Sequence, residues 1–588
     1  MHKIKQLHIK NYKSCQETTI TLENYTPLVG YNNAGKSNIL KCIDALVRGK
    51  GQNETSFFDN QKPIEIIALL EGLDENSLLH LNKQQITSLE PYIEGGSLSV
   101  RFFQETPGTG KNAVVMGIQK PSELGVGDWV NPNGLPQAIT TLFPEPTFIN
   151  SMEDSAEDVS KFKASNTIGK LIAHLQKEII TSKAVEINDA LEVVGKKLSL
   201  NGSERLDELD RFDLSINDKI GDFFPGLSLN IDIPTPSIAD LFKQGTIKVS
   251  EVGTARQSDF IDMGHGSQRA IQMTLIRHLA EITKDVAKQG KTNILLIDEP
   301  ELFLHPQAIE LLRSSLKALS KKGYQIIFST HSPYMIEQSD IPITNIIRKN
   351  NNGTVVTTRL KEALSQTLLD NDSQARLLFD TYNLGQILFS DKVLIAEGAT
   401  EKIVLPALFN SVIGKTLGEH KLALVIADGA GNIPKMIEIL EKMGITTKVL
   451  VDLDFAFTSA VDQGLIQETD SSIESCLTII KNIQPTHNFN MNGRLPCKGR
   501  GSVLRASDVY ELMAAENDAT IHINKIKEDM KNHSIWIWSK GAIEPHLCLE
   551  TKENKEWLKF RQKLTTDPIE SCVNDLDEIR DFFSWCIS

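Results

Sequence analysis

Short apolar runs that end in polar or acidic residues recur along the chain, and segments with apolar residues at helical spacing separate them. Such runs are typical of buried strands in a parallel sheet that is covered by helices. The clearest runs are residues 293–298 (NILLID), 325–329, 344–348, 392–396 (KVLIA), 422–426 (LALVI) and 448–454 (KVLVDLD). The pattern predicts an α/β protein with two successive strand–helix series, the second of which begins near residue 392.

Other patterns fill the spaces between these runs. Residues 64–118 contain strand-like runs joined by polar loops, which predict an antiparallel sheet, and residues 354–360 predict an edge strand. A helical segment over residues 361–384 ends the first series. From about residue 155 to residue 211, apolar residues recur at helical spacing within charged sequence. This stretch predicts a helical insertion, either a solvated one or, as the alternative, a dimerising arm.

Length and composition limit the possible classes of protein. A chain of 588 residues is too long for one core, and 40% hydrophobic with 23% charged residues is ordinary for a globular protein. No apolar run is long enough to span a bilayer, and the N-terminus lacks the apolar core of a secretory signal. The seven cysteines form no CxxC pair, which favours a reducing compartment, the cytoplasm. A net charge of −14 argues against a general coating of nucleic acid but leaves room for a local basic patch.

The first candidate site is a glycine-rich loop, Gly30–Ser37 (GYNNAGKS), between a strand-like run and a helical segment. It fits the phosphate loop G-x-x-x-x-G-K-S, in which backbone N–H groups face the phosphates. Lys36 can reach the terminal phosphates of a nucleotide, and the hydroxyl of Ser37 can bind Mg²⁺. A chance glycine loop is the alternative, and the strand-before, helix-after context argues against it.

Three further pieces carry polar groups at the ends of predicted elements. Asp298 and Glu299 end an apolar run, where one carboxylate can hold Mg²⁺ through water and the next can polarise an attacking water. Gly264–Arg269 (GHGSQR) opens a helix, and His331 follows a buried strand. Alone, the turn is explained by N-capping through Ser267, and the histidine by a structural role.

The second candidate site is a set of acids in the later strand–helix series. Glu397 ends one apolar run and Glu401 follows it by four residues, while Asp452 and Asp454 end another run, where strand alternation would put both on one face. Adjacent parallel strands would bring these four acids to their carboxyl ends, where α/β sheets place their sites. Such a cluster needs Mg²⁺ or Mn²⁺ to neutralise it, and a metal pair can activate water for phosphodiester cleavage. Solvated acids at strand ends are the alternative for any one of them.

Together, the motifs resemble known families. The pieces IKNYKS, GYNNAGKSN, GHGSQR, LLIDEPELFLHP and STHSP look like the chromosome-maintenance and recombination branch of the ATP-binding-cassette ATPases. The pattern EGATE, ADGAGN and DLD resembles a Toprim domain. An ATPase of this type followed by Toprim is the layout of the OLD (overcoming lysogenization defect) nuclease family. The boundaries follow as ATPase N-terminal lobe 1–154, helical insertion with possible dimerisation role 155–240, ATPase C-terminal lobe 241–384, Toprim 385–549 and helical tail 550–588.

The resemblance implies roles for single residues in the ATPase. Asp298 would support Mg²⁺, Glu299 would polarise water, and His331 would sense the γ-phosphate. The nucleotide would lie between two subunits, which makes the protein a homodimer or larger, with Ser267 of one subunit facing the ATP of another. Gln104 is a weak candidate for the Q-loop glutamine. The remaining ATP-binding residues would be Gly30, Asn32, Asn33, Ala34, Gly35, Lys36, Ser37 and Asn38.

The resemblance also completes the nuclease site. Lys540 in WSKGAIE matches the family's lysine and could stabilise the phosphate in cleavage, with Glu544 beside it. A further metal-binding acid is expected before it, with Asp508 the candidate and Glu511 its rival. No tyrosine has a clear claim as nucleophile, which favours metal-activated water.

Between these acids and Lys540 lies a basic, glycine-containing stretch. It would form a DNA-binding loop or, alternatively, a solvated one. Its basic residues are Arg494, Lys498, Arg500 and Arg505.

The resulting hypothesis is a cytoplasmic, ATP-regulated, Mg²⁺- or Mn²⁺-dependent DNA endonuclease or nickase. In the family, such proteins serve phage interference or antiviral defence, sometimes beside a helicase or a retron reverse transcriptase. One rival is a DNA-repair or structural ATPase whose Toprim-like part binds without cutting. Another is a topoisomerase-like strand passer.

Overall fold

The computed structural model describes most of the chain. The described residues are 2–79, 81–124, 127–143, 146–150, 167–243, 248–250, 253, 257–282, 292–365, 378, 381–497, 504–547, 549 and 553–588. They form two compact units, each assembled from separate stretches of sequence. Unit 1 comprises Met1–Gln6, Leu22–Tyr25 and Leu40–Ser329, and unit 2 comprises Leu7–Thr21, Thr26–Ile39 and Thr330–Ser588. No helix in the described residues is long and apolar enough to cross a membrane.

Unit 1 contains a parallel and an antiparallel group of strands. In the parallel group, β10 (Asn293–Asp298) pairs with β11 (Tyr324–Thr330) on one side and with β7 (Thr147–Ile149) on the other. The antiparallel group consists of β4 (Ile64–Glu71), β5 (Leu98–Gln104) and β6 (Val115–Gln119), as the sequence predicts. The run at 293–298 is almost wholly buried, which explains its unbroken apolar character.

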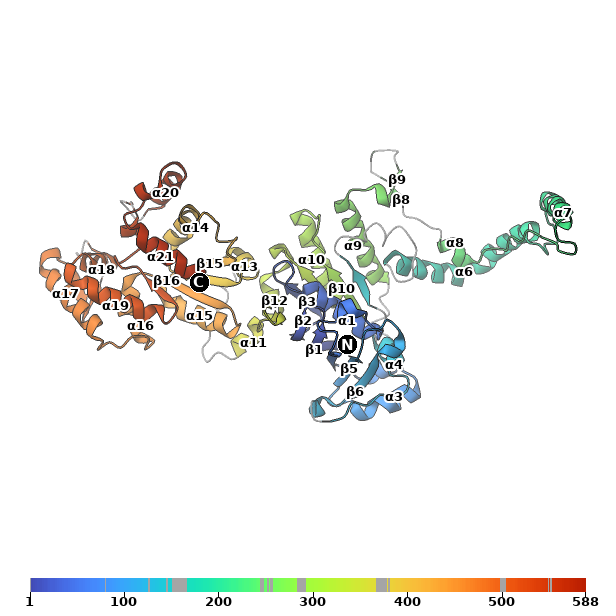
Figure 1. Cartoon of the computed structure of the whole chain (residues 1–588), viewed down its shortest axis with the longest axis horizontal. Coiled ribbons are helices and arrows are strands. Elements are labelled where there is room, and N and C mark those ends of the chain that lie inside the picture. Colours follow the sequence, from blue (N-terminus) through green and yellow to red (C-terminus); the bar gives the residue numbers. More distant parts are fainter. Residues whose placement is uncertain are drawn as a thin grey trace. The chain divides into compact units, whose positions relative to one another are not determined.

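The helices of unit 1 include the predicted insertion. It forms α6 (Thr167–Leu198) and α7 (Asp207–Gly221), with α7 at the far end of α6 in Figure 1. Arg205, in the turn between them, stabilises this turn through ion pairs to Asp210 (2.8 Å) and Asp213 (2.7 Å). Residues 155–166 of the predicted insertion lie outside the described part of the chain. The other helices in this region are α1 (Lys36–Arg48), α2 (Glu75–Leu78), α3 (Lys83–Leu89), α4 (Leu135–Leu142), α8 (Ile238–Lys243), α9 (His265–Ile282) and α10 (Pro306–Ser320).

In unit 2, the first group of strands carries the phosphate loop. Here β12 (Asn345–Asn350) pairs in parallel with β3 (Tyr25–Val29) and antiparallel with β13 (Gly353–Val356). The predicted edge strand is wrong in position, because β13 also pairs with β2 (Cys15–Thr21) and therefore has a neighbour on both sides. Leu360 already opens helix α11 (Leu360–Ser365).

The second group in unit 2 is a four-stranded parallel sheet in the order β15-β14-β16-β19. Its strands are β14 (Lys392–Ala396), β15 (Leu422–Ile426), β16 (Thr446–Val451) and β19 (Ile535–Ile537). The helices around it are α13 (Thr381–Ile387), α14 (Ala399–Ile413), α15 (Ile433–Lys442), α16 (Ser459–Asp462), α17 (Ser471–His487), α18 (Ala506–Ala514), α19 (Thr520–Lys531), α20 (Asn554–Thr566) and α21 (Leu576–Ile587).

Alternate residues of this sheet face two separate cores. Val393, Ile395 and Val451 pack with the helices α15, α17, α18 and α19. Leu394 and Leu450 point to the opposite face, where α14, α20 and α21 cover the sheet (Figure 1). The described part of the predicted tail thus supplies α20 and α21, two helices of this second layer, and contributes buried side chains to its core.

Candidate functional sites

In the phosphate loop of unit 2, the side chain of Lys36 is held by backbone carbonyls of the same loop. The buried ammonium of Lys36 donates hydrogen bonds to the carbonyls of Gly30 (3.0 Å) and Tyr31 (3.1 Å) and lies 2.8 Å from Nε2 of His331. Only glycine fits at position 35, because its φ is +109° and a Cβ there would lie 2.0 Å from Oγ1 of Thr354. The structure therefore brings Lys36 and His331 together, as a site for the terminal phosphates requires.

The remaining loop residues have distinct environments. Asn32 and Asn33 are exposed, and Asn33 has a φ of +67°. Ala34 is buried, and Asn38 donates a hydrogen bond to Oγ of Ser14 (2.7 Å). The loop thus has an open side and a side fixed to neighbouring backbone.

The carboxylates that follow β10 form a second group, within unit 1. Oγ of Ser329 donates a 2.5 Å hydrogen bond to Asp298 and accepts the N–H of Glu299 at 3.0 Å. Glu299 has a φ of +49°, a left-handed conformation that costs a non-glycine residue energy and that clusters at functional sites.

The helix that begins with the glycine-rich turn, α9, is hydrogen-bonded to the backbone of these two acidic residues. The buried guanidinium of Arg269 donates to the backbone carbonyls of Asp298 and Glu299, each at 3.0 Å. Ser267 is exposed on the first turn of the same helix. Gln104, the candidate Q-loop residue, is buried and satisfied locally, because its amide donates to the carbonyls of Gln52, Thr106 and Gly108.

The predicted acids of unit 2 gather at the carboxyl ends of β14 and β16. Ala396 pairs with Leu450, so Glu397 and Asp452 leave the sheet at the same edge. Asp454 lies in a different element from the one predicted. Strand β16 ends at Val451, and Asp454 lies in the 3-10 helix η10 (Leu453–Phe457), so the argument from strand alternation was wrong.

The acids at this edge of the sheet affect one another's ionisation. Burial raises the pKa of Asp452 well above its ordinary value, and the charges of Glu401, Glu397, Asp454 and Glu544 raise it further. Burial, then the charges of Glu544 and Glu397, raise the pKa of Glu401 to about 7, although backbone hydrogen bonds oppose this shift. The N–H of Gly398 donates one of these bonds to Glu401 (3.1 Å).

Glu544 is the member of this group to which the sequence assigned no role. It lies in the 3-10 helix η12 (Glu544–His546), and the hydroxyl of Thr400 donates to its Oε1 at 2.9 Å. The signal that could have identified it is its position four residues after Lys540, in the segment already singled out.

Asp508 and Glu511 lie elsewhere, on α18. Asp508 accepts the N–H of Arg505 at 2.7 Å and thereby caps this helix. Both acids line a cavity of about 570 Å³ together with Lys540 and a mostly apolar wall of Leu504, Leu512, Ala514, Ala515 and Pro545. The candidate lysine and the two candidate acids therefore line the same cavity.

The basic stretch before α18 is only partly described. Arg494 forms ion pairs with Glu474 (2.5 Å) and Glu468 (3.5 Å), and Arg505 precedes the first turn of α18. Lys498 and Arg500 lie outside the described residues.

Comparisons with known proteins agree with these two kinds of site. Residues 2–92 and 82–336 match the AAA ATPase domain family, and residues 388–454 match the Toprim domain of overcoming-lysogenization-defect-like proteins. The molecule thus has an AAA ATPase domain followed by a Toprim domain that contains a parallel sheet.

Three named relatives match the chain over most of their length. The chain is 33% identical to the Old nuclease of Escherichia phage P2, over 99% of both chains. It is 23% identical to the OLD nuclease of Thermus scotoductus (77% of this chain, 82% of that one) and 22% identical to endonuclease GajA of Bacillus cereus (77% and 75%). The chain belongs to the OLD nuclease family.

Proposed function

We propose that this chain is a DNA endonuclease or nickase that uses Mg²⁺ or Mn²⁺ and is regulated by ATP. The observation that carries the proposal is the group of carboxylates around Asp452, of which Glu401 is buried and the others are half-buried. The neighbouring carboxylates raise the pKa of Glu401 and of Asp452, and such a group of acids is costly to bury without a cation. A nuclease domain that binds divalent metal accounts for this arrangement.

The residues fit a site for hard divalent cations, whose preferred ligands are carboxylate oxygens. When bound, the metal would activate water and stabilise the charge that develops on the phosphate. Lys540 would add a positive charge beside the cavity into which the DNA backbone would fit. The residues that would hold the metal are Glu397, Glu401, Asp452, Asp454 and Glu544, with Asp508 remaining a prediction from the resemblance.

Plasmid cleavage tests the proposal. Supercoiled DNA incubated with the full chain and Mn²⁺ should become nicked or linear, and Glu397→Gln should reduce the rate by at least about a hundredfold. Glu441→Gln, the same substitution at an exposed position of α15, should cut like the wild type. Intact plasmid with both the wild type and Glu397→Gln would favour a non-cleaving DNA-binding ATPase. Resealed topoisomers would favour a strand passer.

ATP binding is supported by the phosphate loop. The residues that would hold the phosphates are Gly30, Gly35, Lys36, Ser37 and those between them. Asp298 would support Mg²⁺, Glu299 would orient water, and His331 would contact the γ-phosphate, because its ring already lies against the ammonium of Lys36. The exposed Ser267 would meet the nucleotide of a second copy.

Assembly as a dimer is supported by the helical insertion. Large apolar side chains are exposed around α7, and Phe223 and Phe224 are 80% and 64% exposed. Contiguous exposed apolar side chains mark association sites. The replacement of both phenylalanines by serine should lower the molar mass measured by light scattering to that of one chain, whereas a Lys219→Ser control, at an exposed position of α7, should not.

A role in phage interference or antiviral defence is supported by the similarity to the Old nuclease of a phage. Association with a helicase or a retron reverse transcriptase stays a prediction from the resemblance.

A further inference from the structure

The C-terminal helix α21 lies against the segment that carries Lys540. Trp538, next to this segment, packs against Phe582 of α21 with ring centroids 5.1 Å apart, and Trp536 packs against the same ring at 5.4 Å. All three side chains are buried. This aromatic contact fixes the first turn of α21 beside residues 539–546.

Polar groups at the start of α21 contact several atoms of the segment that carries Lys540, which we call the lysine segment. Asp575 forms an ion pair with Nζ of Lys540 at 3.0 Å. Glu578 accepts hydrogen bonds from the N–H and the hydroxyl of Ser539, and Lys527 pairs with it at 2.5 Å. The backbone N–H of Lys540 donates to Nε2 of His546 at 3.3 Å.

The same segment is joined to the acids on its other side. The N–H of Leu453, which lies between Asp452 and Asp454, donates to the carbonyl of Gly541 at 2.7 Å. Gly541 has a φ of +97°, and a Cβ there would lie 2.8 Å from Cγ of Glu511. The lysine segment is therefore fixed between the acid-bearing turn and α21, with little freedom for its backbone.

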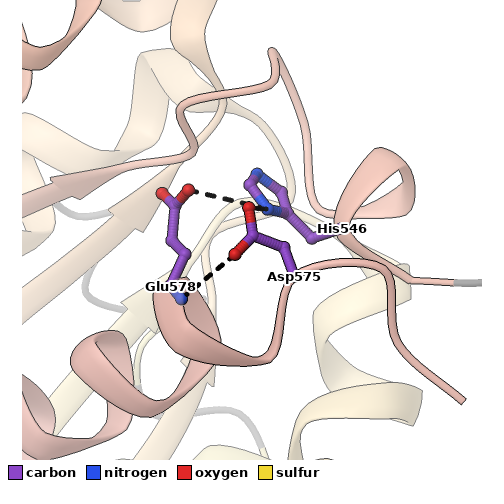
Figure 2. A group of neighbouring side chains, drawn as sticks. All are labelled: His546, Asp575 and Glu578. Carbon is purple, nitrogen blue, oxygen red and sulfur yellow. Dashed lines mark hydrogen bonds and ion pairs between the residues drawn. The ribbon is translucent and has the colours of Figure 1, made fainter. Parts of the chain in front are cut away.

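A metal ion is the obvious alternative for part of this network. Figure 2 shows His546, Asp575 and Glu578 facing one another, with possible ligand atoms within 4.8 Å. The interactions that these three residues already make argue against a bound metal ion. Lys540 and Lys527 already neutralise the two carboxylates. Because Nε2 of His546 accepts a hydrogen bond, its Nδ1 carries the proton, and Nδ1 lies 3.5 Å from Asp575 and 3.6 Å from Glu578.

We propose that Asp575, on the C-terminal helix, is a positioning residue for Lys540 in DNA cleavage, and that His546 and Glu578 hold the backbone around it. This inference rests on the nuclease function proposed above. The Lys540–Asp575 pair is partly exposed, with 41% and 27% of the side chains accessible, so it contributes little to stability. Its effect is to keep a flexible ammonium in one place at the wall of the cavity.

Kinetics of plasmid nicking by the full chain test this inference. Asp575→Asn keeps an oxygen that can cap α21 but removes the charge that holds Lys540. We expect kcat to fall about tenfold or more, with KM for DNA within about twofold and an unchanged melting temperature. Asp575→Glu should recover part of the loss. Asp577→Asn, an exposed neighbour on the same helix, should behave like the wild type.

A double-mutant cycle separates positioning from an independent role. If Asp575 acts through Lys540, the double variant Lys540→Ala/Asp575→Asn should cut no more slowly than Lys540→Ala alone. Wild-type kcat in Asp575→Asn, or losses that multiply in the double variant, would overturn the inference. A failure of the nuclease proposal itself would appear differently, as cleavage that survives in Glu397→Gln.

Discussion

At the scale of single residues, Glu401 shows how an acid of the proposed nuclease site lowers the stability of the folded protein. Its carboxyl is buried, and its pKa in the folded protein is about 7, because burial and the charges of Glu544 and Glu397 disfavour ionisation. In the unfolded chain the same group has an ordinary pKa of 4.5. The folded state therefore binds the proton more tightly, and folding loses stability as the pH rises from 4.5 to 7.

Replacement of this carboxyl gives a pH-dependent prediction. In EDTA at pH 8, Glu401→Gln should melt at a higher temperature than the wild type, and the difference should shrink as the pH falls towards 5. Thermal unfolding followed by circular dichroism measures it. Glu441→Gln serves as the control, and a gain that is equal at both pH values would contradict the argument.

Ser329 gives a second prediction at this scale. Its buried hydroxyl bonds both Asp298 and the N–H of Glu299, so Ser329→Ala leaves two buried polar groups without this partner. A loss of this kind costs about 1–3 kcal/mol. The steady-state rate of ATP hydrolysis should fall about tenfold or more, while ATP affinity measured by calorimetry changes little. Ser314→Ala, an exposed position on α10, should hydrolyse ATP normally.

At the scale of elements, the sequence predicts the strands that a local apolar run marks. Apolar runs locate β10, β14 and β16, and the end of each run locates its acid. Asp454 was assigned to a strand because DLD alternates, but Leu453 turns into the core as part of η10. The sequence pattern is the same for both, since a 3-10 turn and a strand can each bury one residue between two acids.

The sequence marks Glu544 only by its position near Lys540, and it gives Asp575 no signal. Each lies in a short segment without a repeating pattern, and each meets its partner only in the folded domain. Their roles depend on contacts between residues up to 144 positions apart, as for Thr400 and Glu544. Local periodicity does not encode contacts of this range.

The docking of α21 can be measured through its aromatic contacts. Phe582 is fully buried between Trp536, Trp538 and Phe583. Phe582→Ala should destabilise the Toprim domain by about 3–5 kcal/mol, because a large core side chain is replaced by a cavity. Urea denaturation measures this loss. Leu558→Ala, on the exposed side of α20, should change stability by no more than about 0.5 kcal/mol, and equal losses would contradict the assignment of α21 to the core.

At the scale of the whole molecule, one chain carries a loop proposed to bind ATP and a separate group of acids proposed to bind a divalent metal. Lys36→Ala should lose ATP affinity by tenfold or more, because the ammonium that would meet the phosphates is removed. In plasmid assays, the cleavage rate of the wild type should change when ATP is added, and that of Lys36→Ala should not. An ATP response that survives in Lys36→Ala would contradict regulation through this loop.

The tryptophans are distributed unevenly along the chain. Four of the five, Trp536, Trp538, Trp557 and Trp585, lie beyond residue 388, and the fifth is Trp129. Trp536 lies beneath the ammonium groups of Lys527 and Lys531, at 4.3 and 4.7 Å from the ring centre. Intrinsic fluorescence is therefore a built-in optical reporter of the nuclease half, and a Trp129→Phe variant would make it specific to that half without any added dye.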